Sequence, residues 1–354
     1  MAKTILGLVG ETNINRPNPE TAFHQVQPLL DKADVLFGHM ETTVAEVTTE
    51  NRRDLESEGV KDDLPYKRGW KHSKTECLNA WKAAGFDAVG CASNCSGDAN
   101  AILLQLKALD AIGLPHAGIG MNIAEARKPA IVEKNGVKFG FLSYTSVFWP
   151  QFVPALAYKP GAATAKALMS IVPSPRAVEM PGAMPAVMTW LDEKEKTLVL
   201  EDIAKLRPQV DHTVLSCHWG CSSSTVIEDY QKELAHAAIE AGADVVMGHH
   251  PHLPQGIEVY QGKPIFYSMG NFAFDWWFCR DQLKDGYMAY VVFENGSITG
   301  ASFAPVRRED GSNDAVPLSP DSEAFNSIAA NIRKLSEPFR LETEIADGEV
   351  VIHL

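Results

Sequence analysis

Short apolar runs alternate along the chain with amphipathic stretches, and several runs end in residue types that bind metals or move protons. The runs LGLVG, VLFG, VLSC and VVMG are followed directly by Glu11, His39, His218 and His249. Apolar runs of this length, separated by helical patterns, are typical of buried strands in an α/β fold. Such folds build their sites at the carboxyl ends of strands, so we expect these side chains to lie close together.

The predicted elements alternate between strands and helices. Turn pairs at Asn135-Gly136, Gln261-Gly262 and Asn295-Gly296 interrupt this order and predict hairpins, so the sheet should be mixed. The strands are expected at 4–10, 34–38, 87–93, 212–218 and 243–248, and the helices at 19–32, around Trp81, and at 99–112, 195–206, 226–241 and 322–335.

Residues 149–192 do not follow this alternation. They are rich in Pro, Ala and Met and have weak periodicity. A long stretch of this kind inside an α/β pattern favours an insertion that covers or borders the site. The chain shows no repeat or linker, so we predict a single domain over residues 1–354 that carries this insertion.

Composition narrows the classes of partner. The chain has 354 residues and a formal net charge of -13, without a basic block. Nucleic acids and anionic membranes require clustered Lys and Arg, so neither is an expected partner. No stretch approaches the roughly 18 apolar residues of a membrane span. Six cysteines form no disulfide-like framework, and the amino terminus is predicted as a strand, so we expect reduced thiols and a cytoplasmic protein.

The densest group of candidate ligands is the run GHHPH. In an extended chain His250 and His252 lie two residues apart and point to one face, which makes a pair of imidazoles able to hold a metal. His249 then faces the opposite way. Isolated histidines at other strand ends are more often structural, and we interpret His116, His212 and His236 in that way.

The run GADVVMGHHPHLPQGIEVYQGKPIFYSMGNFAFD resembles the signature of the CapA family, the poly-gamma-glutamate and capsule synthesis proteins of the calcineurin-like metallophosphoesterase superfamily. Earlier blocks resemble other family motifs in the same order: GETNINR, GHMET, GFDAVGCASNCSGD and HWG. The resemblance implies a four-layer α/β/β/α sandwich of two mixed sheets, with a two-metal centre at the strand ends. The superfamily uses such centres mainly for phosphoester hydrolysis.

The resemblance also implies roles for individual residues. The metal ligands would be Glu11, Glu41, Asn94, His218, His250 and His252, holding two divalent ions. Mixed imidazole, carboxylate and amide ligation suits Mn, Fe or Zn. Arg16 would orient an anionic small-molecule or peptide substrate through its guanidinium fork. Asn271 and Asp275 would lie behind the ligands or face the substrate. From the residues themselves, His249 is either a further ligand or a supporting residue, and Trp276 and Trp277 form either a core cluster or, as we favour, an apolar rim for the substrate.

Three positions depart from the family pattern. Glu11 stands in place of Asp and reaches one methylene further. His39 replaces an Asn beside the acidic ligand, which adds a group that can bind metal or titrate near neutrality. Cys95 replaces the His that protonates the leaving group in phosphoesterase relatives. We therefore assign proton transfer to Cys95 or His39, and Cys95 makes ordinary phosphoester hydrolysis less expected.

Three classes of function fit these residues. The first is a metal-dependent hydrolase of a phosphoester or amide-type bond. The second is a metal-dependent peptide or amino-acid epimerase, in which Cys95 takes part in two-base chemistry. The third is a non-catalytic component of poly-gamma-glutamate or capsule synthesis. The sequence favours the hydrolase and leaves the substrate, the metal and the oligomeric state open.

Overall fold

A computed structural model describes residues 3–42, 44, 73–97, 99–275, 283–309 and 314–354. Within them, most strands belong to two large mixed sheets. The first sheet has ten strands in the order β19-β20-β17-β16-β1-β2-β3-β4, with β15 paired to β1 and β18 to β17. Its strands are β1 (Thr4–Asn13), β2 (Val35–Met40), β3 (Ala88–Gly90), β4 (His116–Ala117), β15 (Asn271–Phe274), β16 (Asp285–Glu294), β17 (Ser297–Arg308), β18 (Ala315–Pro317), β19 (Thr343–Ala346) and β20 (Glu349–Ile352).

The second sheet has six strands in the order β13-β14-β12-β11-β7-β6. They are β6 (Ala130–Lys134), β7 (Val137–Thr145), β11 (His212–His218), β12 (Val245–His249), β13 (Ile257–Tyr260) and β14 (Lys263–Phe266). The central four run parallel, and β6 and β13 are antiparallel edges. Both edges come from the predicted hairpins, whose turn residues all have positive φ, as type I′ turns require.

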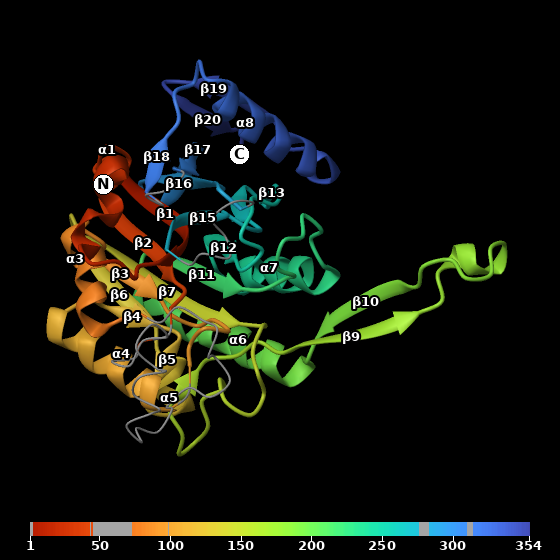
Figure 1. The fold of residues 1–354 in the computed structure, drawn as a ribbon, viewed down its shortest axis with the longest axis horizontal. Coiled ribbons are helices and arrows are strands. Elements are labelled where there is room, and N and C mark those ends of the chain that lie inside the picture. Colours follow the sequence, from red (N-terminus) through yellow and green to blue (C-terminus); the bar gives the residue numbers. More distant parts are fainter. Residues whose placement is uncertain (1–2, 43, 45–72, 98, 276–282, 310–313) are drawn as a thin grey trace.

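The two sheets pack face to face through apolar side chains. Leu8 and Phe37 from the first sheet share a buried cluster with Phe141, Val214 and Met247 from the second. The rings of Phe37 and Phe141 stack across the interface with centroids 4.3 Å apart. On their outer faces, β1, β2 and β3 pack against α3 (Asn79–Ala83) and α4 (Ala99–Ile112), and the second sheet packs against α6 (Glu193–Leu206) and α7 (Asp229–Ala241). The predicted α/β class with mixed sheets is confirmed (Figure 1).

One predicted helix differs from the structure. Residues 19–32 form a 3₁₀ helix, η1 (Pro19–Val26), followed by the single turn α1 (Gln27–Leu30). Pro28 explains the break, because proline has no backbone N–H to donate and its ring clashes with the preceding turn. The other predicted helices form, among them α8 (Glu323–Leu335). No helix among the described residues is long and apolar enough to cross a bilayer.

Residues 149–192 form two parts. Near the body, β8 (Gly161–Ala162) pairs with β5 (Ile119–Gly120), just before α5 (Ile123–Ala126). Further along, β9 (Ala167–Val172) and β10 (Ala186–Leu191) form a two-stranded ribbon joined by a loop that contains η4 (Pro175–Val178). This ribbon projects away from the two sheets (Figure 1).

Candidate metal centre

The carboxyl ends of strands from both sheets meet at one buried group of side chains. Register places Glu11 of β1 opposite His39 of β2 and Asn271 of β15, and it places His218 of β11 opposite His249 of β12. Parallel strands expose their carboxyl ends at the same edge, which is why residues far apart in sequence converge here. Seven residues form three overlapping sets whose ligand atoms lie within 4.8 Å of one another: Glu11, His39, Glu41, His218, His249, His250 and His252.

Glu41 lies between two imidazoles. Its Oε1 is 3.6 Å from His218 Nε2, and its Oε2 is 3.8 Å from His252 Nδ1. Glu11 approaches the same nitrogen, His252 Nδ1, through its Oε2, and its Oε1 accepts a hydrogen bond from the backbone N–H of His250. Both carboxylates are buried. Two buried carboxylates among neutral imidazoles repel each other unless a proton or a cation lies between them.

The two histidines of the GHHPH run do not lie in extended chain. Strand β12 ends at His249, and His250 and His252 have φ values of 100° and 62°. The predicted extended backbone for His250 and His252 is therefore wrong, and strand alternation does not explain how their side chains are oriented. Their rings are still brought together in one set with Glu41. Positive φ is costly for a residue other than glycine, and such strain is found most often at functional sites.

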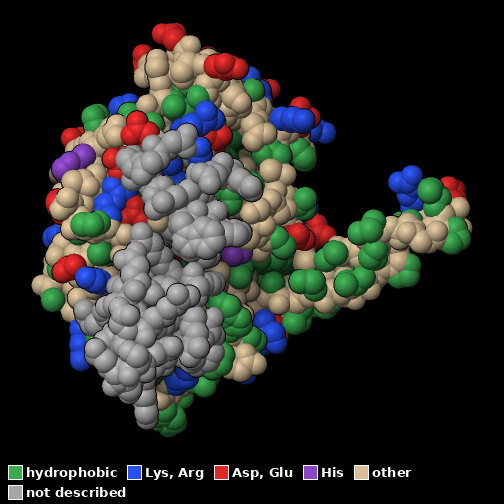
Figure 2. Space-filling view, in the orientation of Figure 1, with side chains coloured by type: hydrophobic (Ala, Val, Ile, Leu, Met, Phe, Trp, Pro, Cys, Tyr) green, Lys and Arg blue, Asp and Glu red, His purple; other side chains and the backbone are tan. Residues whose placement is uncertain are grey.

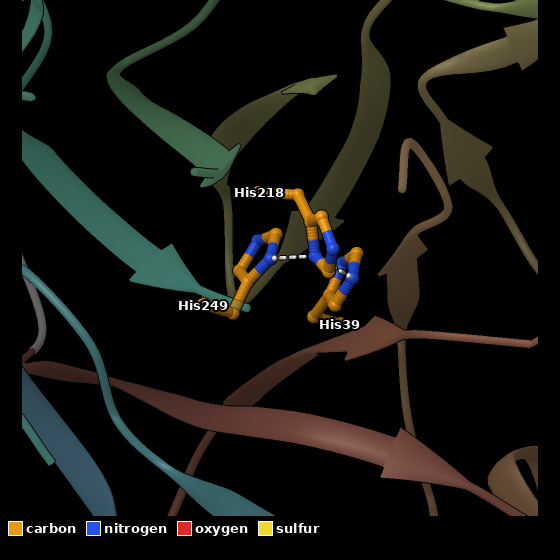
Figure 3. A group of neighbouring side chains, drawn as sticks. All are labelled: His39, His218 and His249. Carbon is orange, nitrogen blue, oxygen red and sulfur yellow. Dashed lines mark hydrogen bonds between the residues drawn. The ribbon is translucent and has the colours of Figure 1, made fainter. Parts of the chain in front are cut away.

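His218 uses both ring nitrogens. Its Nε2 faces Glu41 and is 2.9 Å from Asn94 Oδ1. Its Nδ1 is 3.1 Å from His39 Nε2 and 3.0 Å from His249 Nδ1 (Figure 3), and it also lies 4.0 Å from Glu11 Oε1. His218 thus connects the carboxylate group with a second group of three imidazoles.

The outer two rings of that second group are held in place. His39 and His249 stack with centroids 3.4 Å apart, and His249 Nε2 is 2.8 Å from Ser216 Oγ. Ser216 lies two residues before His218 on β11, so both side chains leave the same face of the strand. The stacked pair fixes the orientation of His218 and hence the direction in which its Nε2 points.

Cys95 lies beside the carboxylates, in the loop after β3. Its thiol donates to Glu41 Oε1 at a sulfur–oxygen distance of 3.5 Å, and its backbone N–H donates to Ser93 Oγ. The side chain is buried. A thiol in this position can exchange a proton with Glu41.

The sequence profile of the family described as "Bacterial capsule synthesis protein PGA_cap" matches residues 7–276, a range that contains every candidate ligand. The chain belongs to this family.

Individual relatives of the PGA_cap family agree with this assignment. The capsule biosynthesis protein CapA of Bacillus anthracis is 26% identical over 309 residues, which cover 84% of this chain and 64% of that protein. This chain therefore spans less than two thirds of the B. anthracis protein. The PGA biosynthesis protein CapA of Bacillus subtilis is 25% identical over 362 residues, covering 99% of this chain and 80% of that protein. The predicted resemblance to CapA is confirmed.

Among solved structures, TT1561 of Thermus thermophilus matches 81% of this chain and 94% of its own, with 7% identity and a TM-score of 0.40.

Of the remaining residues that the resemblance implies, Asn271 contacts a candidate ligand directly. Asn271 Oδ1 is 3.0 Å from His252 Nδ1, and its amide donates to the carbonyl of Leu283. Trp276 and Trp277 lie outside the described residues. Arg16 is held by two carboxylates, since it makes a forked contact with Asp275 and a further ion pair with Asp314. Its role toward an anionic substrate stays a prediction.

We expect Asp275→Asn to destabilise the fold through Arg16. Both side chains are mostly buried, and breaking a buried pair leaves an uncompensated charge. Because Asp314 remains, the free energy of unfolding should fall by about 2 to 4 kcal/mol. Urea unfolding measures this change, with Asp314→Asn, which removes a more exposed carboxylate, as the milder control. A large loss of substrate affinity with unchanged stability would instead assign Arg16 and Asp275 to the substrate.

Two residues that support the centre are not predicted from the sequence. Ser216 anchors His249, and Asn13 donates from Nδ2 to the backbone carbonyl of Glu41 at 2.7 Å. Asn13 follows Glu11 by two positions in β1 and Ser216 precedes His218 by two in β11. Strand alternation was the signal that could have found both, since residues two apart share a face.

The buried imidazoles give the metal-free protein a defined pH dependence. Burial, followed by the charge of neighbouring histidines, lowers the pKa of His39, His218 and His249 well below the ordinary value. Burial and the charge of His252 lower the pKa of His250 to about 3. Above about pH 6.5 these imidazoles are neutral in both the folded and the unfolded chain. Below that pH the unfolded chain takes up protons that the folded chain does not, so the free energy of unfolding decreases as the pH is lowered.

Glu41 acts in the opposite direction. Burial, and then the charge of Glu11, raise its pKa, so its contribution is present at low pH and is lost as the pH rises. Each of these groups changes the free energy of unfolding by about 1.4 kcal/mol per pH unit. The combined effect of the four imidazoles is therefore larger than that of the one carboxyl. Chelator-treated protein should therefore lose more than about 2 kcal/mol of unfolding free energy between pH 7 and pH 5 in urea titrations. Equal or greater stability at pH 5 would show that these imidazoles are charged in the folded protein.

Proposed function

We propose that the protein is a metal-dependent hydrolase with a two-metal centre at the strand ends of a calcineurin-like, four-layer α/β/β/α sandwich. The observation that carries this proposal is the position of Glu41. Its two oxygens face different imidazoles, His218 and His252, as expected of a carboxylate that bridges two cations. The packing of helices on the outer faces of both sheets supports the layered arrangement.

The donor set fits such a centre. Two sets of three ligands share Glu41: one adds His250 and His252, and the other adds Glu11 and His218. Asn94 Oδ1 lies beside His218 Nε2 and adds an amide oxygen. Glu41 Oε2 and His250 Nδ1 are buried and have no hydrogen-bond partner in the described part of the chain. Buried polar atoms without partners are costly, and a cation would satisfy both.

The protein's own groups would divide the remaining tasks. When bound, two divalent cations of the Mn, Fe or Zn type would acidify a water molecule and stabilise negative charge on the substrate. Cys95, which contacts Glu41, would give a proton to a leaving group. His39 touches His218 but neither carboxylate in any described contact, so it would act through His218 by holding the orientation of that ring.

The substrate class proposed is an anionic small molecule or peptide with a phosphoester or amide-type bond. The names of the relatives concern the biosynthesis of capsule and of PGA, which favours a role in making or trimming such a polymer. A net charge of -13 repels an anion at long range, so local positive charge at the centre must provide the attraction.

The test is hydrolysis by the metal-loaded protein. We expect Mn²⁺-, Fe²⁺- or Zn²⁺-loaded protein to cleave an aryl phosphate, an aryl phosphodiester or a γ-glutamyl amide, and the His250→Ala, His252→Ala double variant to cleave none. The thiol at Cys95 specifically favours the epimerase as a second candidate, and incorporation of solvent deuterium without bond cleavage would support it. A metal-loaded protein inactive in both assays would favour a non-catalytic component of polymer synthesis.

A further inference from the structure

The ribbon formed by residues 167–191, here called the arm, exposes apolar side chains on both faces. Its register pairs Ile171 with Val187 on one face and Leu168 with Trp190 on the other. Eight large hydrophobic side chains of the arm are between 41% and 87% exposed: Met169, Ile171, Val178, Met180, Met184, Val187, Met188 and Trp190. Figure 2 shows hydrophobic side chains along the length of the arm, and its charged residues, Arg176 and Glu179, lie in the connecting loop.

The arm contacts the rest of the chain at its base. The backbone N–H of Tyr230 donates to Thr189 Oγ1 at 3.4 Å, and that of Leu191 donates to Glu233 at 3.5 Å. Beyond this base the arm projects away from both sheets (Figure 1). Among the described residues, neither β9 nor β10 pairs with a further strand, so each has an open outer edge.

An arm of this kind is poorly suited to water. An isolated two-stranded ribbon is at best marginally stable, and open edges with apolar faces promote association. The exposed parts of the eight side chains, at roughly 100–150 Å² each, offer on the order of 1,000 Å² of apolar surface. A stable dimer buries about 800 Å² on each partner, which is of the same order as this apolar surface, and the arm divides that surface between its two faces and the connecting loop.

We propose that the arm is a dimerisation element, which pairs with the same arm of a second copy of this chain about a two-fold axis. Such an arrangement pairs an open edge of each arm with the other and brings the apolar side chains that border these edges into contact. The arm itself has no net charge, because Arg176 and Glu179 are its charged residues. Contact between two arms therefore adds no charge repulsion of its own to that between two chains of charge -13.

A bilayer is a less suitable cover for the arm. Hydrocarbon cannot satisfy the backbone N–H and C=O groups along the open edges of β9 and β10. The acidic chain would also be repelled by anionic lipid headgroups. A second arm meets both requirements, since it offers apolar faces and a strand edge together.

Sedimentation velocity on the purified full chain tests this proposal. The wild type should sediment with twice the chain mass of 38.7 kDa. The double variant Ile171→Lys, Met188→Lys places one charge on each face of the arm and should sediment with the mass of a single chain. The matched control is Ile131→Lys, Ile345→Lys, at exposed positions away from the arm, and it should remain dimeric. Metal content should be unchanged in all three proteins, which separates this proposal from the proposed function.

Hydrogen exchange gives a second readout that does not depend on mass. Amides of residues 168–172 and 186–190 should be protected in the wild type and at least tenfold less protected in the arm variant, while β11 and β12 stay equally protected in both. A wild type of single-chain mass at every concentration, or an arm variant that stays dimeric, would overturn the proposal. Flotation of a monomeric wild type with phosphatidylcholine vesicles would also overturn it, in favour of a membrane.

Discussion

Glu41→Gln is expected to abolish the thermal stabilisation that a divalent cation gives to this protein. A cation that binds the folded state at one hundred times its dissociation constant adds about 2.7 kcal/mol. For a chain of this size that corresponds to a rise in Tm of roughly 2 to 4 °C. Glutamine offers one carbonyl oxygen and no charge, so it could not take the bridging role proposed for Glu41 between His218 and His252.

Without metal, the same substitution should not lower the stability of the protein. Burial and the charge of Glu11 raise the pKa of Glu41, so ionising it at neutral pH costs folding free energy. Glutamine removes that cost, and metal-free Glu41→Gln should be at least as stable as the metal-free wild type. A purely structural carboxylate would give a loss of stability instead.

Scanning calorimetry with and without Mn²⁺, Fe²⁺ or Zn²⁺ after chelation measures both effects. The control is Glu201→Gln, which removes a half-exposed carboxylate from α6 that pairs only with Lys205 among the described contacts. It should keep the full metal-induced rise in Tm. A full rise in Glu41→Gln as well would mean that cations bind elsewhere, and the bridging role of Glu41 would have to be abandoned.

Cys95→His is expected to raise the rate of aryl phosphate hydrolysis about 100-fold or more. General acids contribute roughly 10²–10⁴ to such rates when their pKa lies near the working pH, and imidazole meets this condition better than an ordinary thiol. The substitution introduces the residue type that the family resemblance leads us to expect at this position. The thiol lies 3.5 Å from Glu41 Oε1, so an imidazole that keeps the direction of the thiol would face the same carboxylate.

The matched variant is Cys95→Ala, which removes the thiol without adding imidazole. If the thiol acts as the acid, Cys95→Ala should lose activity while keeping its metal, and steady-state rates with metal analysis of each variant measure both. Equal rates in wild type, Cys95→His and Cys95→Ala would show that Cys95 is only a packed side chain. Loss of deuterium incorporation in Cys95→His would point instead to the epimerase.

The sequence predicted the parts of the fold that depend on local pattern. Strand β11 and helix α4 have the predicted bounds, because apolar runs and helical periodicity are read directly from neighbouring residues. Residues 19–32 were predicted as one helix because the apolar pattern was followed across Pro28, where the chain cannot keep its hydrogen bonds. Local pattern therefore located the elements more reliably than the breaks within them.

The sequence predicts which residues come together in the candidate site, but it does not predict their geometry. Strand ends converge at one edge, which located Glu11, Glu41 and His218 from their positions after apolar runs. The left-handed conformations of His250 and His252 depend on contacts with Glu11 from another sheet, which no local pattern contains. The same holds for Arg16, whose partner Asp314 is almost 300 positions away.

The most direct test of the central claim is elemental analysis of the purified protein beside its His250→Ala, His252→Ala double variant. The control is His24→Ala, His353→Ala, which removes the same number of imidazoles from exposed positions. A two-metal centre predicts about two divalent ions per chain in the wild type and the control, and a loss of most of that metal in the site variant. A wild type that binds no metal when Mn, Fe and Zn are supplied would contradict the metal centre and every role assigned through it.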